Sequence, residues 1–306
     1  MIEGSMLRAL TTAVVLGAVV LAGACGGATS GDAQPSTEGP DGGPTVTAPA
    51  PSGLPCDVDA ILARSCRDCH ASPPRYGAVS PLLTWGDLHA NSATDPSRRV
   101  YEVVAARIAS DARPMPPPPS ARLTPADRET LSAWAAAGAP RGEAGCVTPE
   151  TPSTPPPPIE CAGGEKKVAL SGASPWSMSD DGADEYVCWG IDLAESPARH
   201  ITAFAPRIDN TKVVHHVVLY EASSSYPTTP QRCSSGAAVT WRMVYGWAPG
   251  VKGLTLPPDV GFPIGSSRPT HYVVVMHYSN PQRLRGERDA SGIDLCTSAP
   301  RANEAD

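Results

Sequence analysis

The pentapeptide Cys66-Arg67-Asp68-Cys69-His70 constrains this chain more than any other stretch of the sequence. It has the C-x-x-C-H form that attaches a c-type haem covalently, because two thiols one turn apart add to the vinyl groups of the porphyrin. The adjacent His70 would then supply the proximal nitrogen to the iron. The alternatives are a disulfide and half of a zinc site, but a zinc site needs a second ligand pair at short range. The next cysteine after Cys69 is Cys146, so we expect haem c on Cys66, Cys69 and His70.

The second axial ligand is expected in the proline-rich run Arg113-Pro114-Met115-Pro116-Pro117-Pro118-Pro119. This run resembles the methionine loop of small bacterial c-type cytochromes. A thioether ligand raises the potential of the iron, which suits electron transfer better than oxygen binding. The alternative is that Met115 lies on the surface and that His89, or no residue, completes the coordination. We expect Met115, because no other methionine lies in this part of the chain.

Helical patterns surround the haem motif. Asp57 is a suitable N-cap for a helix whose apolar residues lead to Cys66. Apolar residues at helical spacing predict a second helix over about residues 96–109. The sequence Thr124-Pro125-Ala126-Asp127 predicts the start of a third helix, and Gly138 is a suitable end. Residues 56–146 are therefore predicted to form a small all-α cytochrome c domain.

The N-terminal residues have the pattern of an export signal. Arg8 precedes the apolar run 9–24, which ends in small residues before Cys25. The alternative, a membrane-spanning helix, needs a longer run. Cys25 also fits a bacterial lipobox, which would leave a lipid anchor on this cysteine, although Ala22-x-Ala24 satisfies an ordinary signal peptidase equally. We expect residues 1–25 to be a leader and the protein to be exported to the periplasm or the cell surface.

Two segments are predicted to connect folded units rather than to fold themselves. Residues 26–55 are rich in Gly, Ser, Thr and Pro and are expected to form a disordered tether. Residues 147–160 contain repeated prolines and are expected to form a polyproline II spacer. The net charge of −7 argues against nucleic acid as a partner. The chain is thus predicted to be multidomain.

Residues 161–306 change to a β pattern. Strands are predicted at residues 201–204, 213–220, 239–244 and 272–278, where β-branched and aromatic residues gather between turn-forming residues. Several short strands in succession favour an antiparallel sandwich. We expect an all-β, jelly-roll-like domain here.

Two of these predicted strands carry histidines that could hold a metal ion. His215 and His216 are adjacent, and His277 lies on the later strand with His271 at its start. Imidazoles without a nearby thiolate suit copper. Neighbouring residues of a regular strand point to opposite faces, so both adjacent histidines reach one ion only if the strand is twisted or bulged, or if one ring folds back through its nearer nitrogen. The alternative is that these are core histidines.

Six short motifs follow one another between about residues 165 and 298. They are Asp184–Cys188, Val214–Val217, Trp247–Gly250, Leu256–Gly265, Val274–Tyr278 and Ser291–Ile293. In this order they resemble the copper type II, ascorbate-dependent monooxygenases, the family of peptidylglycine α-hydroxylating monooxygenase and dopamine β-monooxygenase. The resemblance implies that His215, His216 and His277 hold an electron-relaying copper. His271 lies where the family has no ligand.

The resemblance also implies which cysteines form disulfides. Nine are present, and setting aside one for lipid and two for haem leaves six, an even number that suits an oxidising compartment. Spacing alone leaves about 15 possible pairings of six cysteines. The family has a bonded pair matching Cys188 and Cys233, which leaves Cys161 with Cys296 and Cys56 with Cys146.

The function implied is that of an exported haem- and copper-binding oxidoreductase. The family hydroxylates a C–H bond with O2, ascorbate electrons and two coppers in two β-sandwiches, and two histidines and a methionine hold the oxygen-activating copper. We expect haem and relay copper to transfer electrons from an ascorbate-like reductant or a redox protein, with a small molecule or peptide as substrate. No His or Met follows His277, so we expect the second copper to be absent from this chain.

Two other functions compete with this interpretation. The first is an electron-transfer or copper-binding protein without hydroxylase activity of its own. The second is a surface adhesion or scaffold protein with vestigial sites, which would bind no metal.

Overall fold

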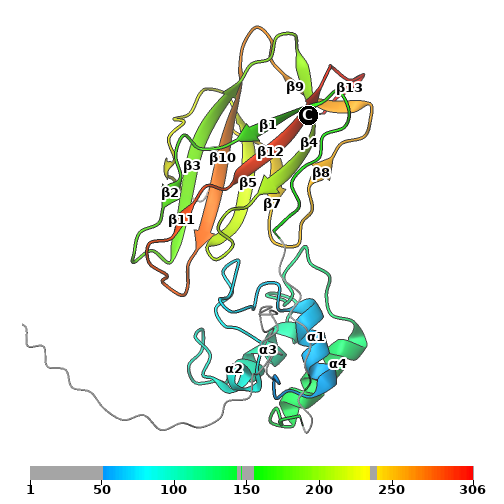
Figure 1. Cartoon of the computed structure of the whole chain (residues 1–306), viewed down its shortest axis with the longest axis vertical. Coiled ribbons are helices and arrows are strands. Elements are labelled where there is room, and N and C mark those ends of the chain that lie inside the picture. Colours follow the sequence, from blue (N-terminus) through cyan, green and yellow to red (C-terminus); the bar gives the residue numbers. More distant parts are fainter. Residues whose placement is uncertain (1–50, 143–145, 147–154, 235–239, 306) are drawn as a thin grey trace, which may run out of the picture. The chain divides into compact units, whose positions relative to one another are not determined.

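The structure is a computed structural model that describes residues 51–142, 146, 155–234 and 240–305 (Figure 1). Four helices occupy the first part of this range, and strands occupy the rest. The expected leader with Cys25, residues 26–50 of the expected tether and residues 147–154 of the expected spacer lie outside the described residues. Within the described ranges, no helix is long and apolar enough to cross a membrane.

The helices bury one apolar core among themselves. Leu62 of the first helix is fully buried, and Ile108 and Leu131 of later helices belong to the same cluster. Burial of such side chains stabilises the folded state by about 1.5–3 kcal/mol each. The helices are α1 (Cys56–Ser65), α2 (Trp85–His89), α3 (Val100–Ala109) and α4 (Pro125–Ala136).

One predicted helix start agrees with the structure and two differ from it. Thr124 caps α4 as predicted, since its side chain accepts a hydrogen bond from the backbone N–H of Asp127. Asp57 was wrongly expected as the N-cap of α1. The helix begins at Cys56 after Pro55, and Asp57 lies in its first turn. α3 begins at Val100 and not near residue 96, because a hydrogen-bonded turn from Asp95 to Arg98 precedes it.

The β part contains two main sheets and one two-stranded ribbon. The six-stranded sheet has the order β1-β12-β4-β9-β13, with β8 paired to β4, and the five-stranded sheet has the order β6-β3-β10-β5-β7. All pairs are antiparallel except β13 with β9. The strands of the six-stranded sheet are β1 (Lys166–Leu170), β4 (Arg199–Arg207), β8 (Leu254–Thr255), β9 (Val260–Ile264), β12 (Gly292–Ser298) and β13 (Asn303–Glu304). Those of the five-stranded sheet are β3 (Asp184–Leu193), β5 (Val214–Ala222), β6 (Gln231–Arg232), β7 (Arg242–Trp247) and β10 (Thr270–Ser279), and β2 (Trp176–Ser177) pairs with β11 (Arg288–Asp289).

The two main sheets share a core, as the expected sandwich requires (Figure 1). Along β10, Tyr272, Val274 and Met276 belong to this core, whereas Val273 and Val275 pack on the opposite face of the sheet. This alternation follows from the two-residue period of a strand. Both faces of β10 are apolar because the shared core covers one face and a second cluster of buried residues, which includes Cys188 and Ala222, covers the other.

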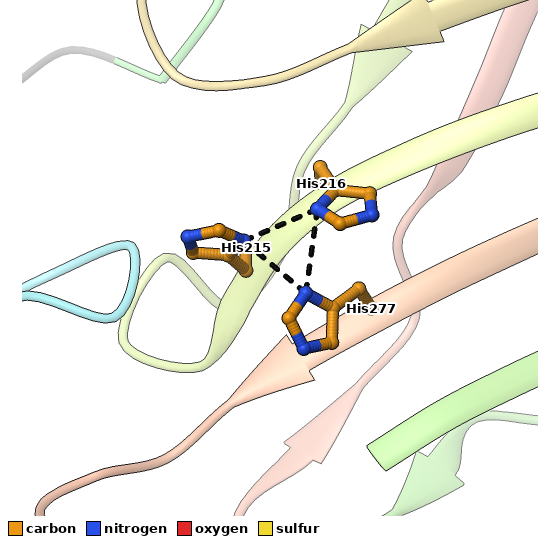
Figure 2. A group of neighbouring side chains, drawn as sticks. All are labelled: His215, His216 and His277. Carbon is orange, nitrogen blue, oxygen red and sulfur yellow. Dashed lines mark hydrogen bonds between the residues drawn. The ribbon is translucent and has the colours of Figure 1, made fainter. Parts of the chain in front are cut away.

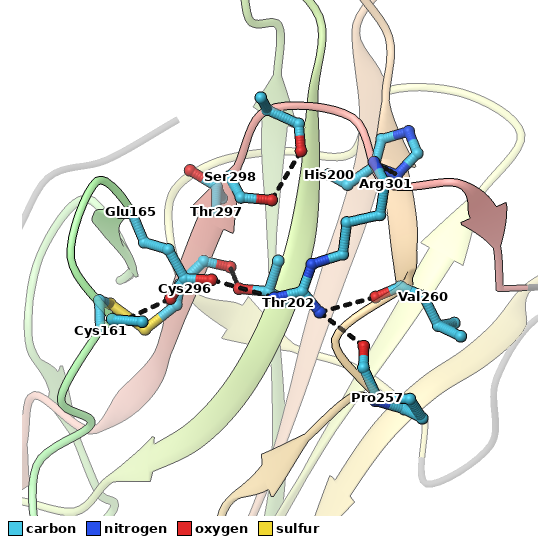
Figure 3. A network of polar contacts seen from close by, with 12 residues as sticks. Cys161, Glu165, His200, Thr202, Pro257, Val260, Cys296, Thr297, Ser298 and Arg301 are labelled. Atoms are coloured by element: carbon cyan, nitrogen blue, oxygen red, sulfur yellow. Dashed lines mark hydrogen bonds and ion pairs between the residues drawn. A yellow bond between two sulfur atoms is a disulfide. The ribbon is translucent and has the colours of Figure 1, made fainter.

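A polar network ties the end of the chain to the six-stranded sheet (Figure 3). The side chain of Arg301 donates to the backbone oxygens of Pro257 and Val260 at 2.8 and 2.9 Å. The backbone N–H of Arg301 donates to Nδ1 of His200, so this buried imidazole has a structural partner. Three disulfides close the fold, and they are the expected pairs: Cys56–Cys146, Cys161–Cys296 and Cys188–Cys233.

Candidate metal centre

Three imidazoles converge at one end of the five-stranded sheet (Figure 2). His215 and His216 lie on β5 and His277 on the neighbouring β10. The Nδ1 atom of His215 lies 3.1 Å from Nδ1 of His216 and 3.2 Å from Nδ1 of His277. The third separation, between His277 and His216, is 3.3 Å. Three nitrogens thus face a common point.

A β-bulge allows two adjacent histidines to face this point. In the pairing of β10 with β5, His277 lies opposite His216 and Tyr278 lies opposite Val214. His215 is therefore the extra residue of β5, and the register shifts there. A bulge locally re-aims side chains that would alternate on a regular strand. A bulge is one of the conditions under which both adjacent histidines can reach one ion.

The three nitrogens fit a metal ion better than they fit one another. Nitrogens that each lie about 2.0 Å from one ion at tetrahedral angles are separated from each other by about 3.3 Å. The observed separations of 3.1–3.3 Å match this value. A neutral imidazole has one N–H and one lone pair, so three mutually facing nitrogens cannot all be satisfied by hydrogen bonds.

The surroundings favour neutral rings with available lone pairs. Burial, followed by the neighbouring rings of His277 and His215, lowers the pKa of His216 to about 4. Burial also lowers the pKa of His215, and His277 adds to the effect. The rings of His215 and His216 are therefore neutral at pH 7, and neutral imidazole is the form that binds metals.

Two residues of β3 hold the ring of His277 and were not singled out from the sequence. Nε2–H of His277 donates to Oδ1 of Asp184 at 2.9 Å, which leaves Nδ1 with its lone pair directed toward the other two histidines. The ring of Tyr186 stacks on His277, with 4.3 Å between ring centroids and 6° between ring planes. Tyr186 lies directly opposite His277 in the pairing of β3 with β10. The motif Asp184–Cys188 was the available signal for both roles.

The other histidine of β10 is held elsewhere. Nδ1–H of His271 donates to Asp192 at 2.7 Å, at the far end of the strand from His277. A second group of potential ligands, Cys161, Glu165 and Cys296, contains the Cys161–Cys296 disulfide, so its sulfurs are not available to a metal.

The haem motif forms a helical turn directly after α1. The backbone N–H groups of Cys69 and His70 both donate to the carbonyl oxygen of Cys66, at 3.2 and 2.9 Å. Neither Cys66 nor Cys69 forms a disulfide. Burial raises the pKa of Cys66 to about 12 and that of Cys69 to about 11. Thioether formation requires two reduced thiols one turn apart, which Cys66 and Cys69 provide.

His70 is oriented by its own loop. Its Nδ1–H donates to the carbonyl oxygen of Ser80 at 2.7 Å, which leaves Nε2 as the nitrogen with a lone pair. A hydrogen bond of this kind fixes the tautomer and orientation of a metal-ligating histidine. Burial lowers the pKa of His70, which keeps the ring neutral at pH 7. The residues present therefore fit a proximal ligand.

Met115 follows α3 and is tied to the last turn of that helix. The backbone N–H of Met115 donates to the carbonyl oxygen of Arg107 at 3.1 Å, and the charge of Arg107 contributes to the lowered pKa of His70 after burial. The rival ligand His89 lies in α2, where its ring stacks on Trp85 with 3.6 Å between centroids.

Two solved virus structures align with this chain only weakly. The structure of infectious bursal disease virus Gx strain aligns with 44% of this chain at a TM-score of 0.21 and 12% identity, which is too low to indicate a shared fold.

Sequence relatives, by contrast, share the β part. DBH-like monooxygenase protein 1 of Gallus gallus is 32% identical over 112 residues, and dopamine beta-hydroxylase of Rattus norvegicus is 31% identical over 134 residues. These matches cover 31% and 39% of this chain but 18% and 22% of the relatives. The chain thus spans about a fifth of the length of these curated relatives. Residues 176–285, which include all three converging histidines, match the family model of the copper type II ascorbate-dependent monooxygenase, N-terminal domain.

Proposed function

We propose that this protein is an exported haem- and copper-binding oxidoreductase that forms part of a copper-dependent monooxygenase. The observation that carries the proposal is the convergence of three Nδ1 atoms at 3.1–3.3 Å within the segment that matches the copper domain. His215, His216 and His277 would hold the copper, which would supply a one-electron Cu(II)/Cu(I) couple.

The chain's own residues prepare this site in three ways. The bulge at His215 brings the two neighbouring rings to one side of the sheet. Asp184 keeps the proton of His277 on Nε2, and Tyr186 covers one face of that ring. Ring orientations fixed in this way suit a centre that changes oxidation state without rearranging its ligands.

A c-type haem on Cys66, Cys69 and His70, with Met115 as the second axial ligand, forms the other half of the proposal. Support comes from the two cysteines without a disulfide, the buried His70 oriented through Ser80, and the connection of Met115 to Arg107. Haem with His and Met ligands supplies a one-electron couple of raised potential.

The domain organisation follows from these two sites. We propose a cytochrome domain at residues 56–146, a spacer at 147–160 and a copper domain at 161–306. A leader at 1–25 would direct export, with a lipid anchor on Cys25. The tether expected at residues 26–55 would be shorter, because Leu54 is fully buried in the core of the helical part and the backbone N–H of Trp85 donates to the carbonyl oxygen of Ser52. The electron donor is then an ascorbate-like reductant or a redox protein, and O2 and a small molecule or peptide are the co-substrates.

Copper titration of single histidine variants tests the copper site. His215→Ala, His216→Ala and His277→Ala should each weaken copper binding by more than about 100-fold, because each removes a ligand. Loss of a residue that only hydrogen-bonds to a ligand typically costs about 10–100-fold. His271→Ala is the matched control, since His271 lies on β10 but bonds to Asp192. The electron paramagnetic resonance spectrum of Cu(II) should show nitrogen couplings. Unchanged affinity in all three variants contradicts the proposed site.

Haem attachment is tested in a host that matures c-type cytochromes. The protein should be red, and its haem should resist acid-acetone extraction. Cys66→Ala or Cys69→Ala should weaken attachment, and the double variant should abolish it. Met115→Ala should remove the long-wavelength sulfur-to-iron charge-transfer band. Extractable haem in the unchanged protein contradicts a c-type centre.

A second function, electron transfer without hydroxylation, is favoured by one observation. Among the described residues, the converging histidines form the one group of three potential ligands that no disulfide occupies. Oxygen consumption coupled to product formation, measured with the loaded chain, separates the two functions.

A further inference from the structure

A loop that follows the haem motif contacts the sheet that carries the three histidines. The backbone N–H of Tyr76 donates to the carbonyl oxygen of Thr211 at 2.8 Å. The side-chain amide of Gln282 donates to the carbonyl oxygen of Ala78 at 3.2 Å. The ring of Tyr76 packs edge-on against Trp247, with 6.1 Å between centroids. Two connections of the β part and the end of β7 thus hold one short loop.

The loop approaches one of the candidate copper ligands at Gly77. Its φ of +77° is a conformation that favours glycine. A Cβ atom at this position would lie 3.0 Å from Cδ2 of His215 and 3.0 Å from Oγ of Ser279. The backbone of Gly77 is therefore in van der Waals contact with the His215 ring, and a larger residue would push the two apart.

A second loop of the helical part makes a comparable contact. Gly250, with φ of +91°, belongs to the turn after β7, and a Cβ atom there would lie 2.5 Å from Oγ of Ser120. Ser120 closes a turn at the end of the proline-rich run that contains Met115. The loop after the haem motif and the segment after Met115 therefore both contact the β part.

Short backbone connections join Gly77 to the haem motif. The N–H of Arg75 donates to the carbonyl oxygen of Cys69 at 2.8 Å, so two further residues lead from there to Gly77. From the other side, Nδ1–H of His70 donates to the carbonyl oxygen of Ser80, three residues beyond Gly77. Both a thioether cysteine and the proximal histidine are thus tied to the loop that touches His215.

We propose that residues 70–82 form a built-in electron bridge between haem and copper, with Gly77 as its contact to His215; this rests on the proposed haem and copper sites. The helical part then donates to the copper of the same chain rather than to a separate protein. One electron moves from Fe(II) to Cu(II), which gives Fe(III) and Cu(I), and no covalent bond forms or breaks. An ascorbate-like reductant restores Fe(II).

Pulse radiolysis of the full chain carrying Fe(III) haem and Cu(II) tests the bridge. A single injected electron should first reduce the haem, seen as growth of its sharp visible band. The band should then decay in a first-order phase whose rate is independent of protein concentration, while the Cu(II) resonance signal decreases to the same extent. The copper-free protein should lack this decay.

Three variants test whether the electron passes through the contact between Gly77 and His215. Gly77→Ala should remove the first-order phase and leave a slower decay that depends on protein concentration. Gly164→Ala is the matched control, because Gly164 also has positive φ, at +85°, but nothing lies within 4 Å of the added carbon. Gln282→Leu loosens the loop without touching a proposed ligand and should also weaken the first-order phase. The haem spectrum and copper stoichiometry of each variant show that both sites remain loaded.

The outcomes are distinguishable. Absence of covalent haem or of bound copper defeats the proposed function itself. If both centres load but the haem band decays at a rate proportional to protein concentration, the transfer is between molecules and the bridge is wrong. An unchanged first-order rate in both Gly77→Ala and Gln282→Leu also overturns it.

Discussion

At the scale of single residues, the ring of His277 is fixed from two directions by neighbours on β3. Asp184 accepts its Nε2–H, and Tyr186 stacks on its face. A carboxylate partner raises the basicity of a ligating imidazole and restricts its rotation. Asp184 keeps most of its side chain exposed, so solvent weakens its electrostatic effect.

Asp184→Asn is expected to weaken copper binding by about tenfold, at the lower end of the effect of such partners. The amide retains an oxygen acceptor for Nε2–H but removes the negative charge. Competition against a chelator of known affinity measures the change. Asp181→Asn provides the control, because Asp181 is an exposed acid on the turn before β3. An equal loss in both variants would point to net charge instead of the contact with His277.

Glu185, the neighbour of Asp184, is expected to make stability depend on acid pH. Burial raises its pKa, but hydrogen bonds from Ser179 and Trp176 and the charge of Arg232 outweigh burial, so its pKa is lowered. A carboxyl whose folded pKa lies below its unfolded value of about 4.3 stabilises above that pH and loses its effect as the pH falls through the folded pKa. Glu185→Gln should therefore cost about 1–3 kcal/mol at pH 7.

The difference in unfolding free energy between Glu185→Gln and the unchanged protein should shrink as the pH falls below the folded pKa of Glu185. Urea unfolding at pH 7 and at a series of acid pH values measures it. Glu195→Gln is the matched control, since Glu195 pairs with the exposed Lys166 at 3.4 Å. A difference in unfolding free energy that stays constant with pH would contradict the assigned role of the ionised Glu185 carboxylate.

At the scale of elements, the Cys188–Cys233 bond joins β3 to the segment after β6. Cys188 is buried on the outer face of the five-stranded sheet with Val273 and Val275. The bond closes a loop with a sequence separation of 45 residues. Because a cross-link of that length restricts the unfolded chain, replacing both cysteines by alanine should lower the stability of the β part by about 4 kcal/mol.

Thermal unfolding followed by near-ultraviolet circular dichroism checks this prediction. The matched comparison is the Cys56→Ala, Cys146→Ala double variant, whose bond closes the helical part. That variant should shift the haem-associated transition and leave the transition of the β part unchanged. A Cys188/Cys233 variant as stable as the unchanged protein would show that packing in the outer cluster alone fixes β3.

The sequence predicted elements best where local chemistry decides them. Thr124 and Pro125 start α4 because capping is a property of adjacent residues. β5 and β10 were found from their β-branched and aromatic residues, whereas β3 was named only as a motif and α2 was missed. α2 has only five residues, too few to show a helical period. The bulge at His215 depends on pairing with β10, which only the folded sheet defines.

At the scale of the whole molecule, different observations support the copper part and the haem part. The family model covers residues 176–285 and leaves the helical part unmatched. The three proposed copper ligands were expected from the order of six motifs, and the structure brings their side chains together. The haem ligands rest on a five-residue motif and on the geometry around His70. Separate measurements of iron and copper are therefore needed.

Without added protein, this chain is expected to bind one copper and to form no hydroxylated product. In the resembling family, oxygen chemistry takes place on a second copper held by two histidines and a methionine. Here three of the seven histidines converge, His70 is proposed for iron, and the remaining His89, His200 and His271 each bond to a different partner. Among methionines of the described residues, Met178 and Met276 are buried in the shared core.

Loading the chain with haem and copper, adding ascorbate and O2, and screening phenethylamine-like and glycine-extended substrates tests this expectation. Metal analysis should give one copper per chain, and product should not exceed the background of the His277→Ala variant. Adding a separately produced polypeptide with an oxygen-activating copper site should restore turnover if the chain is a relay module. Product formed over several turnovers without added protein would show that the chain activates oxygen by itself, which would contradict this expectation.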